Sequence, residues 1–203
     1  DSELGTIQPI DKIIEIKKKY PDCRLHVDAT QAIGRIPFSF DGIDTMSLAP
    51  HKFGGLNGSG ILLKREGVAM EPLLNGGAST TIYRSGTPAL AMAVTSALAL
   101  EMALAQEDEV NARISEYNHM LRKELSAYSR VQINSPKHSV PHILNLSVEG
   151  IKGTEFQKAL TEREVCVSVK SACSVENTPS RSVFAISRDR KRALSSWRIS
   201  MGS

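Results

Sequence analysis

Cysteine is scarce in this sequence of 203 residues. Its three cysteines, Cys23, Cys166 and Cys173, have no paired spacing, which excludes a domain built on a disulfide framework. They also form no metal-ligand spacing with the five histidines, so no metal site is predicted. This cysteine usage is typical of a reducing compartment, and a cytoplasmic location is expected.

Long apolar runs and an excess of charge are lacking too. The most apolar stretch, residues 88–105, carries two hydroxyl side chains and Glu101 and is short for a membrane span, so a buried helix is predicted there. No signal-peptide pattern is present, and no membrane association is expected. The net charge of +3 is too small to indicate direct nucleic acid binding. The densest basic run, residues 188–192, contains one aspartate and is predicted to lie in a solvated loop, with a phosphate-bearing partner or RNA as the alternative.

The sequence does have the composition of a globular protein, with 41% hydrophobic and 23% charged residues. An amphipathic helix is predicted over residues 9–20, and short apolar strands over 24–28, 45–48 and 58–63. Because a helix or a long crossover separates these strands, we expect an α/β layer with functional groups at the strand ends.

The pattern changes in the second half of the chain. Thr87 and Pro88 are predicted to be the N-cap and first residue of the long apolar helix. A more polar helix over 107–128 then leads into strands at 142–148, 165–169 and 197–201, with a helix at 154–163. Two domains are therefore predicted: an α/β domain over 1–108, and a bridging helix with a small α+β domain over 109–203.

Two chemically distinctive residues lie at the ends of predicted strands. Asp28 closes the first strand, and Lys52 lies in the turn after the second, flanked by His51 and by Gly54 and Gly55. Pyridoxal 5′-phosphate (PLP) requires both groups, because its aldehyde forms a Schiff base with a lysine amine and its pyridine nitrogen stays protonated beside a carboxylate. The pattern therefore favours a PLP enzyme.

Each of these residues also has a purely structural interpretation. An aspartate at a strand end commonly caps the next turn, a single lysine is typically solvated, and the glycines fit a hairpin without a ligand. Gln31 would reach a ring hydroxyl on the same side as Asp28 but indicates nothing alone. The grouping of these side chains with Lys52 and His51 across two strand ends favours the cofactor interpretation.

Two residues of the second domain are candidates for chemistry. Cys173 lies among small residues in a predicted mobile loop, and is either a reactive thiolate or an inert thiol. Cys166 is predicted to lie in the core of an apolar strand. Arg198 lies within another apolar strand and requires a carboxylate partner, either a structural Asp or Glu or the carboxylate of a substrate.

Four segments, in order, resemble the PLP-dependent cysteine desulfurases of the class V aminotransferase family. They are HVDATQAIG at 26–34, HK at 51–52, RSGT at 84–87 and SACS at 171–174. The resemblance runs from residues 2–6 to residues 198–200, so it covers nearly the whole chain. It implies the fold-type-I architecture: half of a large α/β cofactor domain with a mostly parallel sheet, followed by a small α+β C-terminal domain. The SACS segment resembles desulfurases with a long mobile cysteine loop.

The resemblance implies how the cofactor is held. Lys52 would be the Schiff-base lysine, Asp28 the partner of the pyridine nitrogen, and Gln31 a ligand of the ring hydroxyl. His51 would help to hold the phosphate, and Thr87 would contact the phosphate of the partner subunit in a homodimer.

The resemblance also implies the reaction. Cys173 would attack the sulfur of PLP-bound L-cysteine, keep that sulfur as a persulfide and release L-alanine, while Arg198 would hold the substrate α-carboxylate. The persulfide would pass to a sulfur-acceptor protein for iron–sulfur cluster or thionucleoside synthesis.

The sequence departs from the family pattern in three ways. Ser2 stands where the family usually has an asparagine that contacts the ring hydroxyl, and Ala49 where it usually has a phosphate-binding serine. The family's N-terminal part, with its phosphate-binding turn and ring-stacking histidine, and its last helices are not in this sequence. A fragment is therefore expected, with weak or no PLP binding and no turnover of its own.

Two other functions fit the same residues. One is another class V enzyme, a selenocysteine lyase or an aminotransferase, and transamination would not need Cys173. The other is a non-catalytic scaffold for sulfur relay or assembly, which the two altered cofactor contacts would allow.

Overall fold

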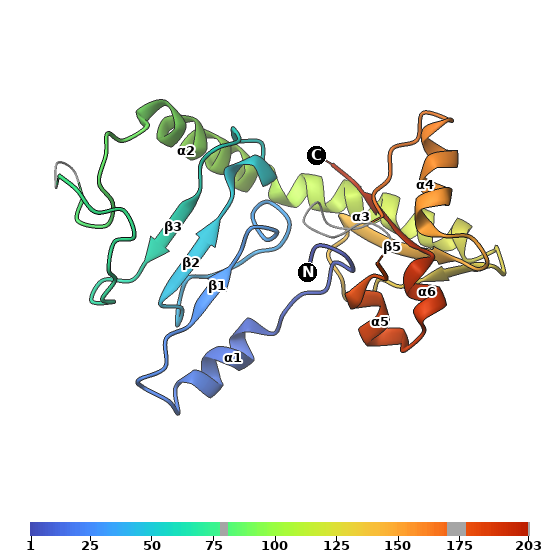
Figure 1. Ribbon diagram of the computed structural model, residues 1–203, viewed down its shortest axis with the longest axis horizontal. Helices are drawn as coiled ribbons and strands as arrows, with labels where there is room; N and C mark the ends of the chain where they lie inside the picture. Colours follow the sequence, from blue (N-terminus) through green and yellow to red (C-terminus); the bar gives the residue numbers. More distant parts are fainter. Residues whose placement is uncertain (78–80, 170–177, 203) are drawn as a thin grey trace. The chain divides into compact units, whose positions relative to one another are not determined.

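The chain folds into two compact units, which the computed structural model describes over residues 1–77, 81–169 and 178–202 (Figure 1). The first unit comprises residues 9–107, and the second comprises residues 1–8 together with residues 108–203. The sequence-based division at residue 108 places residues 1–8 in the first domain, whereas in the structure these residues pack with the second unit.

The first unit is built on a three-stranded sheet. Its elements are α1 (Ile10–Lys17), β1 (His26–Asp28), β2 (Thr45–Leu48), the 3-10 helix η1 (Pro50–Lys52), β3 (Ile61–Lys64) and α2 (Leu90–Ala105). β1 pairs with β2 in parallel, and β3 pairs with β2 antiparallel. Because side chains alternate along a strand, Met46 and Leu48 enter the core while Thr45 and Ser47 lie on the other face.

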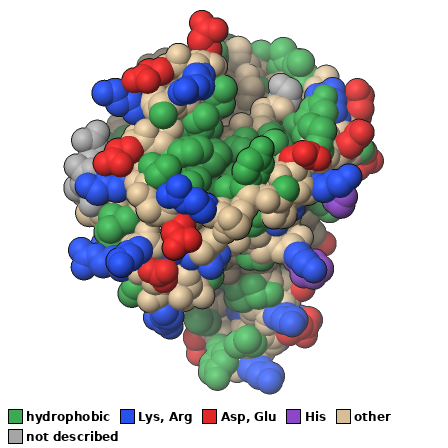
Figure 2. Space-filling view, turned by 90° about the vertical axis from the view of Figure 1, so that its right-hand side faces the viewer, with side chains coloured by type: hydrophobic (Ala, Val, Ile, Leu, Met, Phe, Trp, Pro, Cys, Tyr) green, Lys and Arg blue, Asp and Glu red, His purple; other side chains and the backbone are tan. Residues whose placement is uncertain are grey.

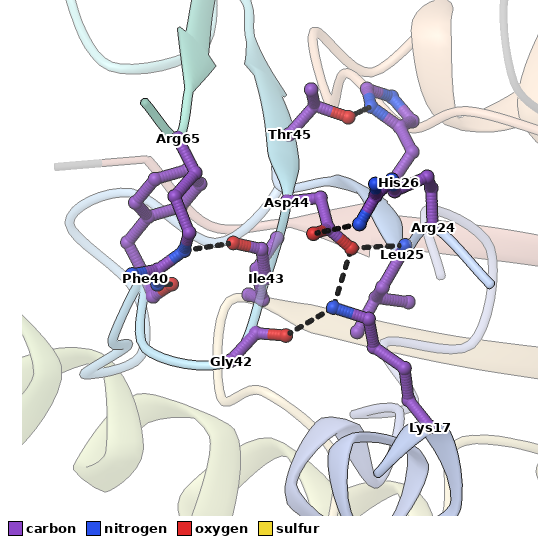
Figure 3. A network of polar contacts seen from close by, with 10 residues as sticks. All are labelled: Lys17, Arg24, Leu25, His26, Phe40, Gly42, Ile43, Asp44, Thr45 and Arg65. Carbon is purple, nitrogen blue, oxygen red and sulfur yellow. Dashed lines mark hydrogen bonds and ion pairs between the residues drawn. The ribbon is translucent and has the colours of Figure 1, made fainter. Parts of the chain in front are cut away.

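A buried carboxylate joins α1 to this sheet. Asp44, directly before β2, accepts a hydrogen bond from the Leu25 amide at 2.7 Å, and its Oδ2 lies 2.5 Å from Lys17 Nζ (Figure 3). Arg24 is more distant, with Nη1 at 3.9 Å from Oδ1. The Leu25 amide, followed by Lys17, holds the pKa of Asp44 below its ordinary value. Asp44 therefore anchors the last turn of α1 beside the start of β1.

Helix α2 is not the buried helix that its apolar composition predicts. Only Ser96 and Ala99 are buried, because one face alone packs on the core of the first unit. Residues four apart form an exposed stripe on α2, with 52% to 72% of each residue exposed: Leu90, Val94, Leu98 and Met102. The predicted start is wrong as well, since α2 begins at Leu90 and its cap residue is Ala89, which makes no side-chain capping bond.

The second unit is built on an antiparallel sheet in the order β4-β5-β6. Its elements are α3 (Glu107–Leu125), β4 (Val131–Ile133), β5 (Ile143–Val148), α4 (Gly153–Thr161), α5 (Arg181–Ser187), α6 (Arg190–Leu194) and β6 (Ser196–Ser200). Leu144 and Leu146 of β5 are fully buried, and Trp197 of β6 stacks on Phe156 of α4 with ring centroids 4.9 Å apart. The sequence prediction missed the short elements β4, α5 and α6.

The basic run at 188–192 does not form the predicted solvated loop. Asp189 caps α6 by accepting hydrogen bonds from the backbone amides of Lys191 and Arg192 at 2.8 and 3.2 Å. Arg192 then turns inward, where its Nε donates to Asn134 Oδ1 at 2.6 Å. The aspartate that suggested a loop is instead a helix cap, and one of the cations is structural.

The predicted strand at 165–169 is reduced to a single bridge between Ser168 and Arg198. Cys166 is exposed, so its assignment to the core is wrong. A single bridge does not form the hydrogen-bonded ladder of a strand, so this segment does not join the sheet in a way that would bury Cys166.

Residues 1–8 belong to the second unit because several contacts fix them there. The Val140 amide donates to the Gly5 carbonyl at 2.8 Å, and Leu4 is buried against Val183 and Ala193. These contacts join residues more than 130 positions apart in the chain, and no local sequence pattern reports such pairing.

Replacing Gly153 with alanine is expected to destabilise the second unit by about 2 kcal/mol, because an added Cβ would overlap the Ser196 carbonyl oxygen. Urea unfolding followed by the fluorescence of Trp197, the sole tryptophan of the sequence, measures the loss. Gly202→Ala is the matched control, since a Cβ there meets nothing within 4 Å. Equal stability of the two variants would contradict the expected overlap.

Hydrophobic side chains gather between charged ones on the face drawn in Figure 2. Among the described residues, no single helix is long and apolar enough to cross a membrane. α2 and α3 reach that length and composition only together, and the chain bends by 62° between them.

Candidate active site

Two candidate cofactor residues lie at one edge of the first unit's sheet. β1 and β2 are parallel, with Asp28 opposite Ser47, and η1 follows β2 after one residue. Asp28, the last residue of β1, and Lys52, which follows β2, therefore lie at the carboxyl ends of neighbouring parallel strands, where open α/β sheets bind ligands.

Asp28 is exposed and ionised. Its Oδ1 accepts a hydrogen bond from the Thr30 amide at 2.9 Å. Hydrogen bonding by the Thr30 side chain is the main cause that lowers the pKa of Asp28 below its ordinary value, and partial burial opposes it. A carboxylate that keeps its charge near neutral pH is what a protonated ring nitrogen requires of its partner. Thr30 is not among the site residues predicted from the sequence.

Lys52 closes the η1 turn and is exposed, as is His51. Its ammonium group makes no hydrogen bond or ion pair with any other residue in the described part of the chain. The turn is tight because the Gly55 amide donates to the Pro50 carbonyl at 2.8 Å, and a Cβ on Gly55 would lie 2.7 Å from Pro50 Cβ. A glycine is thus required at position 55 for the chain to fold back behind Lys52.

The other predicted cofactor residues occupy different settings. Gln31 is half-buried, and its Oε1 accepts a hydrogen bond from Arg35 Nη1, so its side chain is engaged within its own turn. Thr87 is exposed and precedes α2. The structure thus brings Asp28 and Lys52 to one sheet edge, whereas Gln31 would have to exchange its partner to meet a ligand.

Arg198 belongs to the second unit and lies in the middle of β6. Its Nη1 donates to the Ser2 carbonyl, and its buried Nε has no hydrogen-bond partner among the described residues. Burial lowers the pKa of the Arg198 guanidinium, and Glu3 opposes that shift. No carboxylate in the described residues lies within ion-pair distance of it. Of the two partners left open by the sequence, a structural ion pair is therefore absent in this part of the chain.

Cys173 lies outside the described residues.

Two further residues were not predicted from the sequence. Glu3 lies near Arg198, and Ser180 lies at the start of α5. The only sequence signal for Glu3 is that the family resemblance begins at the segment containing it. No group of three or more His, Cys, Asp or Glu residues suited to a metal ion occurs in the described part of the chain.

Comparison with known proteins supplies the family context. The family description aminotransferase class-V matches residues 1–203. A NifS/IcsS protein homolog from Lactobacillus delbrueckii subsp. bulgaricus is 36% identical over 179 residues, which cover 86% of this chain and 46% of the homolog. Cysteine desulfurase IscS from Dictyoglomus turgidum is 33% identical over 207 residues, covering the whole chain and 52% of that protein.

A solved structure named NifS-like protein superposes with a TM-score of 0.89 at 33% identity, covering 99% of this chain and 53% of that structure. This similarity confirms the predicted fold class, which is part of a fold-type-I architecture. The chain spans about half the length of the curated relatives it matches.

Proposed function

Because the chain belongs to the class V aminotransferase family, we propose that it forms part of a PLP-dependent cysteine desulfurase. The observation that carries this proposal is the position of Asp28 and Lys52 at the carboxyl ends of neighbouring parallel strands. Asp28 is a stabilised carboxylate, and Lys52 is an amine without a partner among the described residues. The relatives named cysteine desulfurase supply the reaction.

The described residues fit the proposed cofactor. Asp28 would hold the ring nitrogen in its protonated form, Lys52 would offer its amine to the aldehyde, and His51 would donate to the phosphate. Gln31 would leave Arg35 to meet the ring hydroxyl. When bound, PLP would supply an aldehyde carbon for amine addition and an electron-poor ring that stabilises negative charge on the substrate.

The proposed net reaction moves one sulfur atom. The thiol of Cys173 and the thiol of L-cysteine give a persulfide on Cys173 and L-alanine: the carbon–sulfur bond of the substrate breaks, a sulfur–sulfur bond forms, and the former Cβ gains a proton. Arg198 would hold the substrate α-carboxylate. No external oxidant is needed, because the sulfur atom is oxidised as the carbon atom is reduced.

The partners proposed for the whole protein follow from this reaction. They are L-cysteine, a sulfur-acceptor protein and a second copy of the enzyme, with Thr87 reaching the phosphate held by the partner subunit. A cytoplasmic location is proposed on the cysteine usage of the sequence.

PLP added to the chain and reduced with borohydride is expected to label Lys52 above all other lysines, because Asp28 and His51 would hold the cofactor beside its amine and reduction traps even a weak reversible adduct. Peptide mass mapping locates the label. In Lys52→Ala the excess label disappears, and in Asp28→Ala it falls, since the ring loses its anchoring carboxylate.

Lys64→Ala is the matched control, because Lys64 is also a lysine of the first unit and donates to the Val68 carbonyl at 2.8 Å. Labelling spread evenly over the lysines, or unchanged in Lys52→Ala, would refute the cofactor assignment.

A further inference from the structure

Glu3 occupies a fixed position beside Arg198. Its backbone carbonyl accepts a hydrogen bond from Asn145 Nδ2 at 3.2 Å, and Asn145 is the cross-strand neighbour of Arg198 in the β5–β6 ladder. The carbonyl of the preceding residue, Ser2, accepts from the Arg198 guanidinium. The N-terminal segment is therefore held to β5 and β6 on both sides of the Glu3 side chain.

The Glu3 side chain is turned toward Ser180. Ser180 Oγ donates to Glu3 Oε2 at 2.5 Å and accepts from the Val183 amide at 3.1 Å, as the N-cap of α5. Ser180 is only 1% exposed, so this hydroxyl cannot readily exchange its partners for water. The charge-assisted bond fixes the Glu3 carboxylate at the start of α5.

The result is an arginine with a carboxylate nearby but not paired with it. Glu3 stabilises the charged form of Arg198, which burial disfavours. No guanidinium nitrogen of Arg198, however, lies within 4.0 Å of a carboxylate oxygen of Glu3, both of which are described residues. The guanidinium Nη1 of Arg198 donates to the Ser2 carbonyl, and its Nε has no hydrogen-bond partner among the described residues.

We propose that Glu3 is a positioning residue, held back by Ser180 so that it balances the charge of Arg198 without occupying the face that takes the α-carboxylate of an amino acid. This inference rests on the proposed function for the identity of the ligand. In physical terms, the carboxylate of Glu3 and the carboxylate of the ligand compete for the Arg198 guanidinium. The hydrogen bond from Ser180 keeps Glu3 from pairing with Arg198.

The test uses the 15N-labelled 203-residue chain and the Arg198 Nε–H resonance, assigned by its loss in Arg198→Lys. In ligand-free Ser180→Ala, the resonance is expected to shift as Glu3 pairs with Arg198. The double variant Glu3→Gln/Ser180→Ala is expected to return it, because glutamine carries no charge. Absence of the shift, or its persistence in the double variant, overturns the proposal.

The second readout is titration with L-alanine, with L-alaninamide as the probe that lacks a carboxylate. The Arg198 signal is expected to shift with L-alanine and not with L-alaninamide. The affinity for L-alanine is expected to be roughly tenfold lower in Ser180→Ala, because the ligand must then displace a charge-assisted hydrogen bond between Glu3 and Arg198. The double variant restores the affinity although it still lacks the α5 cap, so cap loss alone does not predict this result.

Asp189→Ala is the control for cap loss, since it removes the N-cap of α6 in the same unit and is expected to change neither readout. Ser180→Gly keeps the measurement possible if Ser180→Ala does not fold, because glycine is tolerated at an N-cap. If wild-type Arg198 ignores L-alanine, the proposed carboxylate role of Arg198 fails, while the ligand-free comparison still decides the role of Glu3.

Discussion

Replacing Asp44 with alanine is expected to destabilise the first unit by about 3 kcal/mol, the size expected when a buried charge pair with hydrogen bonds is broken. The variant leaves the Leu25 amide without its acceptor and Lys17 without its partner. Far-UV circular dichroism is expected to show that helix and strand of the first unit are lost at a lower urea concentration than in the wild type. The Trp197 transition of the second unit is expected to stay at its wild-type urea concentration.

The effect is expected to depend on pH in one direction. The folded-state pKa of Asp44 is lowered, so its contribution is present in full above the ordinary aspartate value of about 3.9 and is lost as pH falls through the lower folded-state pKa. The difference in stability between wild type and Asp44→Ala should therefore be large at neutral pH and shrink under strong acid.

Asp22→Ala is the matched control, because Asp22 is an exposed aspartate of the same unit and is expected to matter by less than about 0.5 kcal/mol. A loss at Asp22 equal to that at Asp44 would mean that the Lys17 and Leu25 contacts do not stabilise the fold.

Cys173→Ala is expected to abolish release of L-alanine from L-cysteine by the polypeptide encoded by the whole gene, because no other group would accept the sulfur in the proposed reaction. The expected loss is on the order of a thousandfold or more, as when a covalent nucleophile is removed. Alanine formation per enzyme is the measurement, with persulfide on the protein trapped by alkylation and located by mass.

Cys166→Ala is the control, since Cys166 is an exposed cysteine nearby in the sequence. It is expected to retain activity and persulfide. Turnover preserved in Cys173→Ala would favour another class V reaction, such as transamination, over desulfuration. PLP labelling of Lys52 in both variants would show that the cofactor site itself is intact.

Local patterns predicted the elements that carry the first half of the site. The strand over 45–48 matches β2 residue for residue, because alternating apolar side chains meet a turn signal at each end. Asp28 and Lys52 were singled out because strand ends are recognisable in sequence and parallel pairing brings neighbouring ends to one edge.

The remaining features depend on partners far away in the chain. The sequence predicts Asp189 and Arg192 to lie in a solvated loop. In the structure Asp189 instead accepts a hydrogen bond from an amide of α6, and Arg192 donates to Asn134. Glu3 and Ser180 are 177 residues apart, and neither lies in a motif that suggests the other. Sequence periodicity reports the period of an element and says nothing about such pairs.

The separation of residues 1–8 from the rest of the second unit affects the order in which a nascent chain can fold. Residues 9–107 leave the ribosome as one continuous stretch that contains the three strands β1, β2 and β3. Leu4, however, is translated before them and packs against Ala193, which is translated after them. At ~5–20 residues per second the segment waits roughly ten to forty seconds for that partner. During this interval residues 1–8, with the apolar side chains of Leu4 and Ile7, are open to chaperones and proteases, so the second unit is the later one to gain protection.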